Sequence, residues 1–194
     1  MPDPSYGLIV EGRYDGPVFV ELVSKLIPAA EILPARVCDG ITNLKKQFPG
    51  WLRDLERAKQ GDPVDKAFVI RDSGGRNPAA LEQELAKRIE GHTFAFPRGI
   101  EFCVVVRAME TWLLADEEAI NAVASSRSGR SVRRVQEELE HIVDPKDRLR
   151  RLLKQAKLDY TPEVCREIAR RARIDRLQYR CPSFLSFEKK VIGC

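Results

Sequence analysis

The sequence predicts an α/β protein with a mainly parallel sheet, helices on both faces and a helical C-terminal extension. Over residues 1–125, short apolar runs rich in β-branched residues alternate with amphipathic stretches, which is the pattern of right-handed β-α-β crossovers. Residues 126–194 read almost wholly as helix. The chain has 194 residues, 43% of them hydrophobic, and can bury one sizeable core. We therefore expect an α/β domain over residues 1–125 and a basic helical extension over residues 126–194 that packs on it.

The first strand is predicted at residues 6–10, which form an apolar run. A helix is expected next, because a set of apolar side chains falls on one helical face: Phe19, Leu22, Val23, Leu26 and Ile27. Asp15-Gly16-Pro17 predicts the start of this helix, with Asp15 or Gly16 as the cap and then an early proline.

Two more strands are predicted before residue 72. Residues 35–38 are the second strand candidate, and residues 66–71 are the third. Between them, residues 43–59 have a helical pattern, which Pro49 is expected to interrupt because proline lacks a backbone N–H group.

The remaining elements of the α/β part follow the same alternation. Asn77-Pro78 is a typical cap and first turn for a helix that runs through Ile89. Residues 93–96 suggest a short strand, and residues 102–106 are the most strand-like segment of the chain. Four apolar side chains are expected to pack between the two parts: Trp112, Leu113, Phe184 and Phe187.

Composition excludes several classes of protein. The five cysteines are scattered and form no C-x-x-C pair, so a disulfide framework or structural zinc site is not expected. The chain has only two histidines, so a histidine-based metal site or catalytic triad is not expected. No apolar run approaches the roughly 18 residues of a membrane span, and the N-terminus has no secretory pattern. We therefore expect a cytoplasmic protein without membrane contacts.

Acidic residues follow four of the predicted strands closely: Glu11, Asp39, Asp72 and Glu110. The carboxyl ends of parallel strands meet at one edge of a sheet, where open α/β folds bind ligands. Carboxylates that converge there repel one another unless a cation neutralises them, and a divalent ion accepts such oxygen ligands.

Acids after strands also serve as helix caps. Glu11 and Asp72 lie several residues before the nearest expected cap, so neither carboxylate is needed for capping. Asp39, next to Gly40, fits a turn or cap better, and the helix macrodipole alone would favour Glu110 at the start of an apolar helical stretch.

Three segments carry a family resemblance. Residues 8–12, Leu-Ile-Val-Glu-Gly, and residues 68–72, Phe-Val-Ile-Arg-Asp, resemble the two motifs of the Toprim superfamily, found in topoisomerases, bacterial primases and overcoming-lysogenization-defect nucleases. Residues 104–116, Val-Val-Val-Arg-Ala-Met-Glu-Thr-Trp-Leu-Leu-Ala-Asp, together with Cys181-Pro182-Ser183-Phe184, are more closely similar to an uncharacterised bacterial Toprim-like domain family. The resemblance spans most of the chain and implies a Toprim-like sheet.

The resemblance also implies site residues and a cofactor. In the superfamily, a glutamate after the first strand acts in acid–base chemistry or metal binding, and a D-x-D pair holds magnesium. Carried over, this makes Glu11 and Asp72 catalytic and predicts that Mg²⁺ or Mn²⁺ is held by Glu11 and Asp72 with Glu110 or Asp116. The chain departs from the pattern at Asp72-Ser73-Gly74, where the second aspartate is missing and a serine hydroxyl or another acid would have to replace it.

Positive charge is concentrated in the C-terminal part. The net charge is −4 over residues 1–125 and +7 over residues 126–180, so a phosphate-binding face is a reasonable expectation. A solvated helix surface with i,i+4 ion pairs is an equally good interpretation. A glycine turn at residues 73–76 could also receive a phosphate on its N–H groups. The predicted phosphate-binding arginines are Arg13, Arg76, Arg133, Arg134, Arg170, Arg171 and Arg173.

Together these features favour Mg²⁺-dependent phosphodiester chemistry on DNA or RNA, as in a nuclease. The alternative is a non-catalytic nucleic-acid-binding or regulatory module with a degenerate metal site, which the missing D-x-D aspartate favours. Phosphoryl transfer on a small nucleotide uses the same metal chemistry and stays open.

Overall fold

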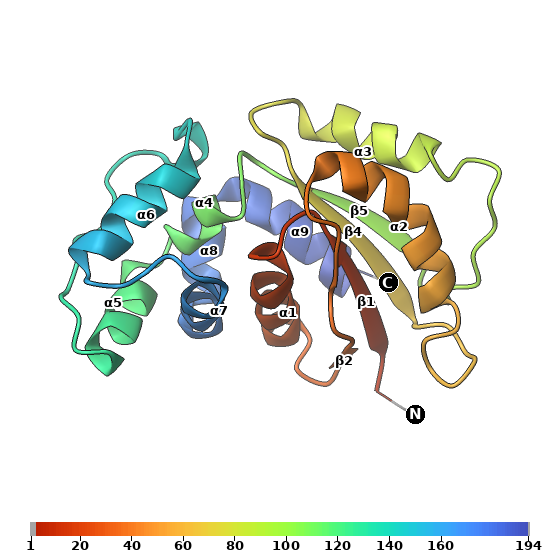
Figure 1. Ribbon diagram of the computed structural model, residues 1–194, viewed down its shortest axis with the longest axis horizontal. Coiled ribbons are helices and arrows are strands. Elements are labelled where there is room, and N and C mark those ends of the chain that lie inside the picture. Colours follow the sequence, from red (N-terminus) through yellow and green to blue (C-terminus); the bar gives the residue numbers. More distant parts are fainter. Residues whose placement is uncertain (1–2, 194) are drawn as a thin grey trace.

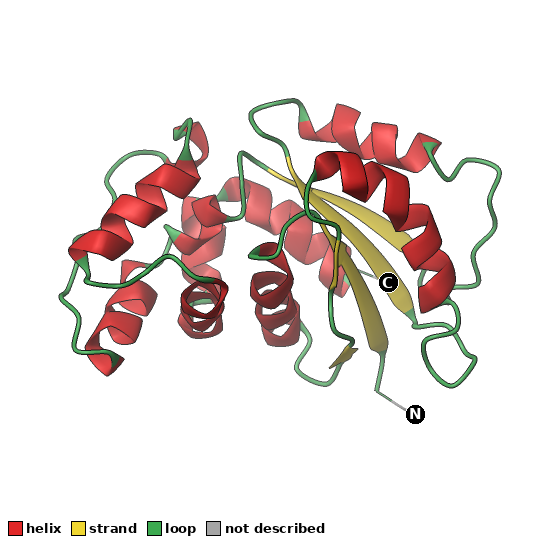
Figure 2. Ribbon diagram, in the orientation of Figure 1, coloured by secondary structure: helices red, strands yellow, loops and turns green. Residues whose placement is uncertain are grey.

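The computed structural model describes residues 3–193 and shows a five-stranded sheet in which every pairing is parallel. The strand order is β2-β1-β4-β5, and β3 pairs with β1 beyond the end of β2 (Figures 1 and 2). This confirms the predicted fold class. The strands are β1 (Ser5–Val10), β2 (Glu31–Ile32), β3 (Arg36–Val37), β4 (Lys66–Asp72) and β5 (Ile100–Val105).

Alternating side chains of the strands belong to two separate apolar clusters, one on each face of the sheet. Leu8 and Val10 of β1 face the helices α1 (Asp15–Leu26) and α9 (Pro182–Ile192). Ile9 faces the opposite side, where α2 (Ile41–Leu55) and α3 (Pro78–Lys87) cover the sheet (Figure 1). Burial on both faces explains why β1 is apolar at nearly every position rather than at every second one.

The other helices continue outward from α1 and α9 (Figure 1). They share the apolar cluster of the α1 face, and α7 packs directly on α1. Trp112 lies edge-on to Phe184, with ring centroids 5.0 Å apart, which confirms the predicted packing between the two parts of the chain. The remaining elements are α4 (Glu110–Leu113), α5 (Glu117–Ser126), the 3₁₀ helix η1 (Leu139–His141), α6 (Pro145–Gln155), α7 (Pro162–Arg171) and α8 (Ile174–Arg180).

Helix α2 runs without a break through Pro49, so the predicted interruption there is wrong. Proline at position 49 cannot donate to the carbonyl of Lys45, four residues earlier. The side chain of Arg88 supplies that donor instead, with Nη1 3.3 Å from the Lys45 oxygen. A neighbouring segment thus satisfies the carbonyl that the proline leaves without a partner.

The predicted short strand at residues 93–96 is also wrong. Phe94 lies under the Arg53 guanidinium, 4.3 Å from the ring centroid, and Phe96 is buried against the α2 face of the sheet. The Ala95 N–H donates to Glu56 Oε1 at 2.7 Å rather than to a strand. The candidate at residues 35–38 forms only the two-residue β3, and β2 was not predicted.

Four cysteines, Cys38, Cys103, Cys165 and Cys181, are free and buried, and Cys194 lies outside the described residues. Within residues 3–193, no helix has both the length and the apolar character required to cross a membrane.

Candidate functional site

The turn after β1 brings two acids to the carboxyl edge of the sheet. Glu11 follows the last strand residue, and its carbonyl accepts from Gly40 N–H at 2.8 Å. Asp15 is the first residue of α1 and is 8% exposed. Its Oδ2 accepts from Gly12 N–H at 2.7 Å. The helix cap is Tyr14 and makes no side-chain cap bond, so the prediction that Asp15 or Gly16 caps α1 is wrong. The Asp15 carboxylate points back to the strand end instead.

The ends of β4 and β5 supply the other two acids. Asp72 is the last residue of β4 and pairs in register with Val105. Its Oδ1 accepts from the Met109 N–H at 3.0 Å, which brings the start of α4 beside it. The next residue, Glu110, is 4% exposed and accepts a hydrogen bond from the hydroxyl of Tyr160. We call Glu11, Asp15, Asp72 and Glu110 the carboxylate cluster.

Asp72 and Asp15 are the two members of the carboxylate cluster whose pKa is raised by other members. Burial raises the pKa of Asp72 well above its ordinary value, and the charges of Asp15, Glu110 and Glu11 raise it further. Burial also raises the pKa of Asp15 to about 7, where Glu110 and Glu11 add to the effect and the Gly12 N–H and Lys146 oppose it. A bound cation would relieve this repulsion between neighbouring carboxylates.

Within the carboxylate cluster, Glu11 is the member on which the charge of Arg71 acts most strongly. Burial raises the pKa of Glu11, and the Arg71 guanidinium acts in the opposite direction. Among the described residues, the buried Oε2 of Glu11 has no hydrogen-bond partner, and neither does Nη1 of Arg71. Unpartnered buried polar atoms are uncommon in folded proteins and call for a water, an ion or a ligand.

A divalent cation suits the chemistry of these donors. Within the described chain, no three His, Cys, Asp or Glu side chains stand in an arrangement that could hold a metal ion. Mg²⁺ does not require one, because it keeps several waters and binds through one or two carboxylates together with substrate phosphates. The unpartnered oxygen of Glu11 and the carboxylate of Asp72 are ligands of that kind.

Ser73 does not replace the missing aspartate of the D-x-D pattern. Its Oγ accepts from the Arg107 N–H at 2.8 Å and from the Gly75 N–H at 3.2 Å. Gly74 N–H donates to the Arg107 carbonyl at 2.9 Å, and Arg76 N–H donates to the Ser73 carbonyl at 3.0 Å. The N–H groups of the glycine turn are therefore bonded within the turn or to the loop after β5, and are not free to receive a phosphate.

Asp116, the fourth acid predicted as a metal ligand, has a different environment. Its Oδ1 accepts from the Glu118 N–H at 3.1 Å, which caps α5, and its Oδ2 pairs with Nε of Arg173 at 3.1 Å. Burial alone would raise the pKa of Asp116, but the bonds from Arg173 hold it below its usual value. Asp116 and Arg173 thus form a structural ion pair, and Asp15 takes the fourth place at the sheet edge.

Cations surround a tyrosine pair beside the carboxylate cluster. Tyr14 and Tyr160 stack with ring centroids 4.5 Å apart. The Arg13 guanidinium lies over Tyr14 at 5.4 Å, and the Arg150 guanidinium lies over Tyr160 at 4.9 Å. The Lys146 ammonium is 5.7 and 5.9 Å from the two ring centroids. We call Arg13, Lys146 and Arg150 the cation rim.

The other predicted phosphate-binding arginines are spread over the surface. Arg76 pairs with Glu84 at 3.6 Å. Arg133, Arg170 and Arg171 are exposed and are not among the leading charges on Asp15 or Asp72.

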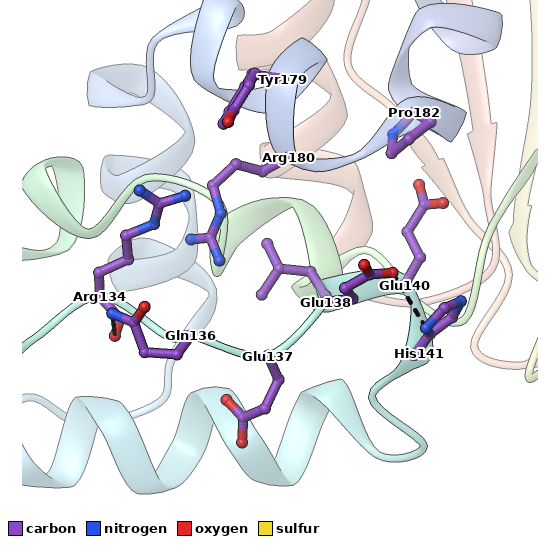
Figure 3. A pocket seen from close by; sticks show the side chains of 10 residues that line it. Arg134, Gln136, Glu137, Glu138, Glu140, His141, Tyr179, Arg180 and Pro182 are labelled. Atoms are coloured by element: carbon purple, nitrogen blue, oxygen red, sulfur yellow. Dashed lines mark hydrogen bonds and ion pairs between the residues drawn. The ribbon is translucent and has the colours of Figure 1, made fainter.

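Arg134 lies at a separate hollow of about 550 Å³ beside η1. Figure 3 shows its guanidinium and that of Arg180 pointing into this space. Arg180 donates to the Val135 carbonyl at 2.5 Å, so it ties the preceding loop to α8. Several lining side chains are acidic, and none belongs to the carboxylate cluster.

Sequence reasoning missed Asp15, Tyr160 and Lys146 as parts of the site. Asp15-Gly16-Pro17 has the pattern of a helix start, which conceals its second role. Tyr160 is 50 residues from Glu110 along the chain, and no local pattern links the two.

No curated protein and no solved structure matches the chain. A family model described as "Domain of unknown function (DUF4276)" matches residues 13–192. The protein therefore belongs to the DUF4276 family.

Proposed function

We propose that the carboxylate cluster is the centre of a Mg²⁺-dependent phosphodiesterase that acts on nucleic acid. The observation that carries this proposal is the convergence of four acids on the carboxyl edge of a parallel sheet. Burial is the largest cause of the raised pKa of Asp72 and of Asp15, and the charges of neighbouring acids raise both further. The order of the motifs around Glu11 and Asp72, which resembles the Toprim superfamily, supports the same reaction.

The residues present divide the chemistry between them. A Mg²⁺ ion bound here would polarise a phosphoryl oxygen and lower the pKa of an attacking water. Glu11 would also accept the proton of that water. The water oxygen bonds to phosphorus, the bond to the leaving oxygen breaks, and solvent protonates that oxygen. Arg71, whose Nη1 has no partner in residues 3–193, would donate to a phosphate oxygen.

The experiment is a cleavage assay on single- and double-stranded DNA and RNA with Mg²⁺ or Mn²⁺. We expect cleavage by the wild type and a loss of at least about 100-fold in Glu11→Gln and Asp72→Asn. Matched controls are Asp54→Asn and Glu90→Gln, which make the same changes at exposed positions outside the site. Absence of metal-dependent cleavage in the wild type, or unchanged rates in both site variants, would contradict the proposal.

A non-catalytic nucleic-acid-binding module is the second candidate. It is favoured by Ser73, whose Oγ is bonded to two backbone N–H groups at the place where the D-x-D pattern has its second aspartate. Calorimetry separates the two candidates. The enzyme should take up Mn²⁺ in a manner that Asp72→Asn abolishes, whereas the module should bind nucleic acid in a salt-dependent manner without any metal.

A further inference from the structure

The helix α6 carries cations of two kinds. Arg148 is paired with Glu137 at 3.0 Å, and Arg151 is paired with Asp147 at 2.7 Å. Lys146 and Arg150, by contrast, close no ion pair within the described part of the chain and lie against the tyrosine pair. α6 has one acid, Asp147, among five bases, and Lys154 also forms no ion pair with the described residues; Lys146 and Arg150 differ from it because they lie against the tyrosine pair.

The position connects them to the carboxylate cluster. The hydroxyl of Tyr160, whose ring Arg150 covers, donates to Glu110. Burial raises the pKa of Asp15 and the charge of Lys146 acts to lower it, so the two side chains are near each other. Within the described residues, however, Lys146 and Asp15 form no ion pair. Both Lys146 and Arg150 are exposed. Because neither cation forms an ion pair with the described residues, both are available to a negatively charged ligand.

We propose that Lys146 and Arg150, with Arg13 of the cation rim, bind the backbone phosphates of a nucleic acid strand and lead it into the carboxylate cluster. This inference rests on the proposed function, because it assigns the substrate-binding groups of the same site. Arg13 follows β1 by three residues and Lys146 is the second residue of α6, so the rim joins the α/β part to the C-terminal helices. The extension therefore contributes directly to substrate binding.

The tyrosine pair indicates how the strand is recognised. Tyr14 and Tyr160 already stack on each other at 4.5 Å, and a cation lies over each ring. Nucleic-acid bases stack on open aromatic faces, whereas this pair presents guanidinium and ammonium groups. Contacts to phosphates carry no sequence information, so the strand is held through its backbone and without base preference.

The test measures binding rather than cleavage. Fluorescence anisotropy with a short duplex DNA, the same strand alone and an RNA copy is recorded in EDTA from about 50 to 200 mM salt, because phosphate contacts dominate the salt dependence in that range. The variant is Lys146→Gln with Arg150→Gln, which keeps helix-forming side chains and removes two charges. The control is Lys87→Gln with Arg151→Gln, which removes two charges from exposed side chains outside the cation rim.

We expect the site variant to bind duplex at least about 10-fold more weakly than the wild type, with the slope of log K against log salt reduced by about 2. The control should keep the slope of the wild type, and Lys146→Arg with Arg150→Lys should restore it. Circular dichroism shows that each variant is folded.

Other outcomes overturn the inference. Equal affinities and slopes for the site variant and its control would do so, as would wild-type protein that binds none of the three probes. Competition by thymidine monophosphate as effective as that by the strand would show that the ligand is a mononucleotide and not a strand. A loss of binding in the site variant without any cleavage by the wild type would support the inference and contradict the proposed function, so the two fail separately.

Discussion

Asp15 and Asp72 are residues whose burial opposes their charge. Glu11 and Asp72 were identified from the sequence because an acid after a buried strand, away from a cap, has no local structural role. Asp15 was not identified, since an acid at a helix start has an ordinary explanation. Only its bond to Gly12 N–H, at 2.7 Å, shows that the carboxylate points to the strand end. Single-residue roles of this kind depend on side-chain direction, which a sequence does not contain.

The raised pKa of Asp15 gives a prediction about pH and stability. The folded chain holds this proton up to about pH 7, whereas the ordinary pKa of an aspartate is 3.8. The stabilisation from the proton is therefore complete below about pH 4 and is lost as pH rises through 7. Asp15→Asn cannot titrate and keeps an acceptor for Gly12 N–H. We expect its free energy of unfolding to rise relative to wild type between about pH 5 and pH 8, by roughly 1–3 kcal/mol. Urea unfolding in EDTA measures this, and a difference that does not change with pH would contradict it.

Tyr160 gives a second prediction at this scale. Tyr160→Phe removes the hydroxyl that donates to the buried Glu110. Leaving that acceptor without its donor should cost about 1–3 kcal/mol of unfolding free energy. Tyr179→Phe is the control, because Tyr179 is 76% exposed and its change should stay within about 0.5 kcal/mol. Equal stabilities for the two variants would show that the Tyr160–Glu110 hydrogen bond does not stabilise the fold.

Among the elements, long apolar runs were predicted well and connecting segments were not. Burial on both faces left a clear signal in β1 and β4. The apolar residues at 93–96 have the alternation of a strand, yet Phe94 and Phe96 cover the α2 side of the sheet while the backbone bonds to side chains. Pairing partners decide whether such a run becomes a strand, and no local pattern reveals them.

Helix α2 allows a direct test of how a chain tolerates an internal proline. The Lys45 carbonyl accepts from Arg88 Nη1 at 3.3 Å in place of residue 49. We expect Arg88→Ala to destabilise the wild type by about 0.5–1.5 kcal/mol. In a Pro49→Ala background the backbone N–H returns, so the same substitution should cost clearly less. A double-mutant cycle by urea unfolding measures the coupling, and additive effects would contradict this account of Pro49.

At the scale of the whole molecule, one apolar cluster runs from the sheet into the C-terminal helices. The sequence predicted a boundary near residue 125 from charge and periodicity, and α5 ends at Ser126. The net charge changes sign at this boundary, but the apolar cluster continues across it, because Trp112 packs against the ring of Phe184. A boundary in composition is visible in a sequence, whereas the continuity of a core depends on contacts between distant residues.

This continuity predicts a single unfolding transition for the full chain. Trp112 belongs to the cluster shared with the C-terminal helices, and Trp51 packs on the opposite face of the sheet. Two variants, Trp51→Phe and Trp112→Phe, each keep one of these tryptophans as the fluorescent probe. In each variant, the unfolding midpoint from fluorescence should coincide with the midpoint from far-ultraviolet circular dichroism, which reports on the helices. Separate transitions would mean that residues 126–194 unfold independently.

The central claim is that Glu11 and Asp72 hold a divalent cation at the carboxyl edge of the sheet. The most direct measurement is the anomalous difference density of a crystal soaked in Mn²⁺. We predict a peak within bonding distance of Glu11 Oε2 and a carboxylate oxygen of Asp72, and no peak there in crystals of Asp72→Asn. Density at that edge showing no ion in the wild type, with both carboxyl groups ordered and hydrogen-bonded to the protein, would contradict the account.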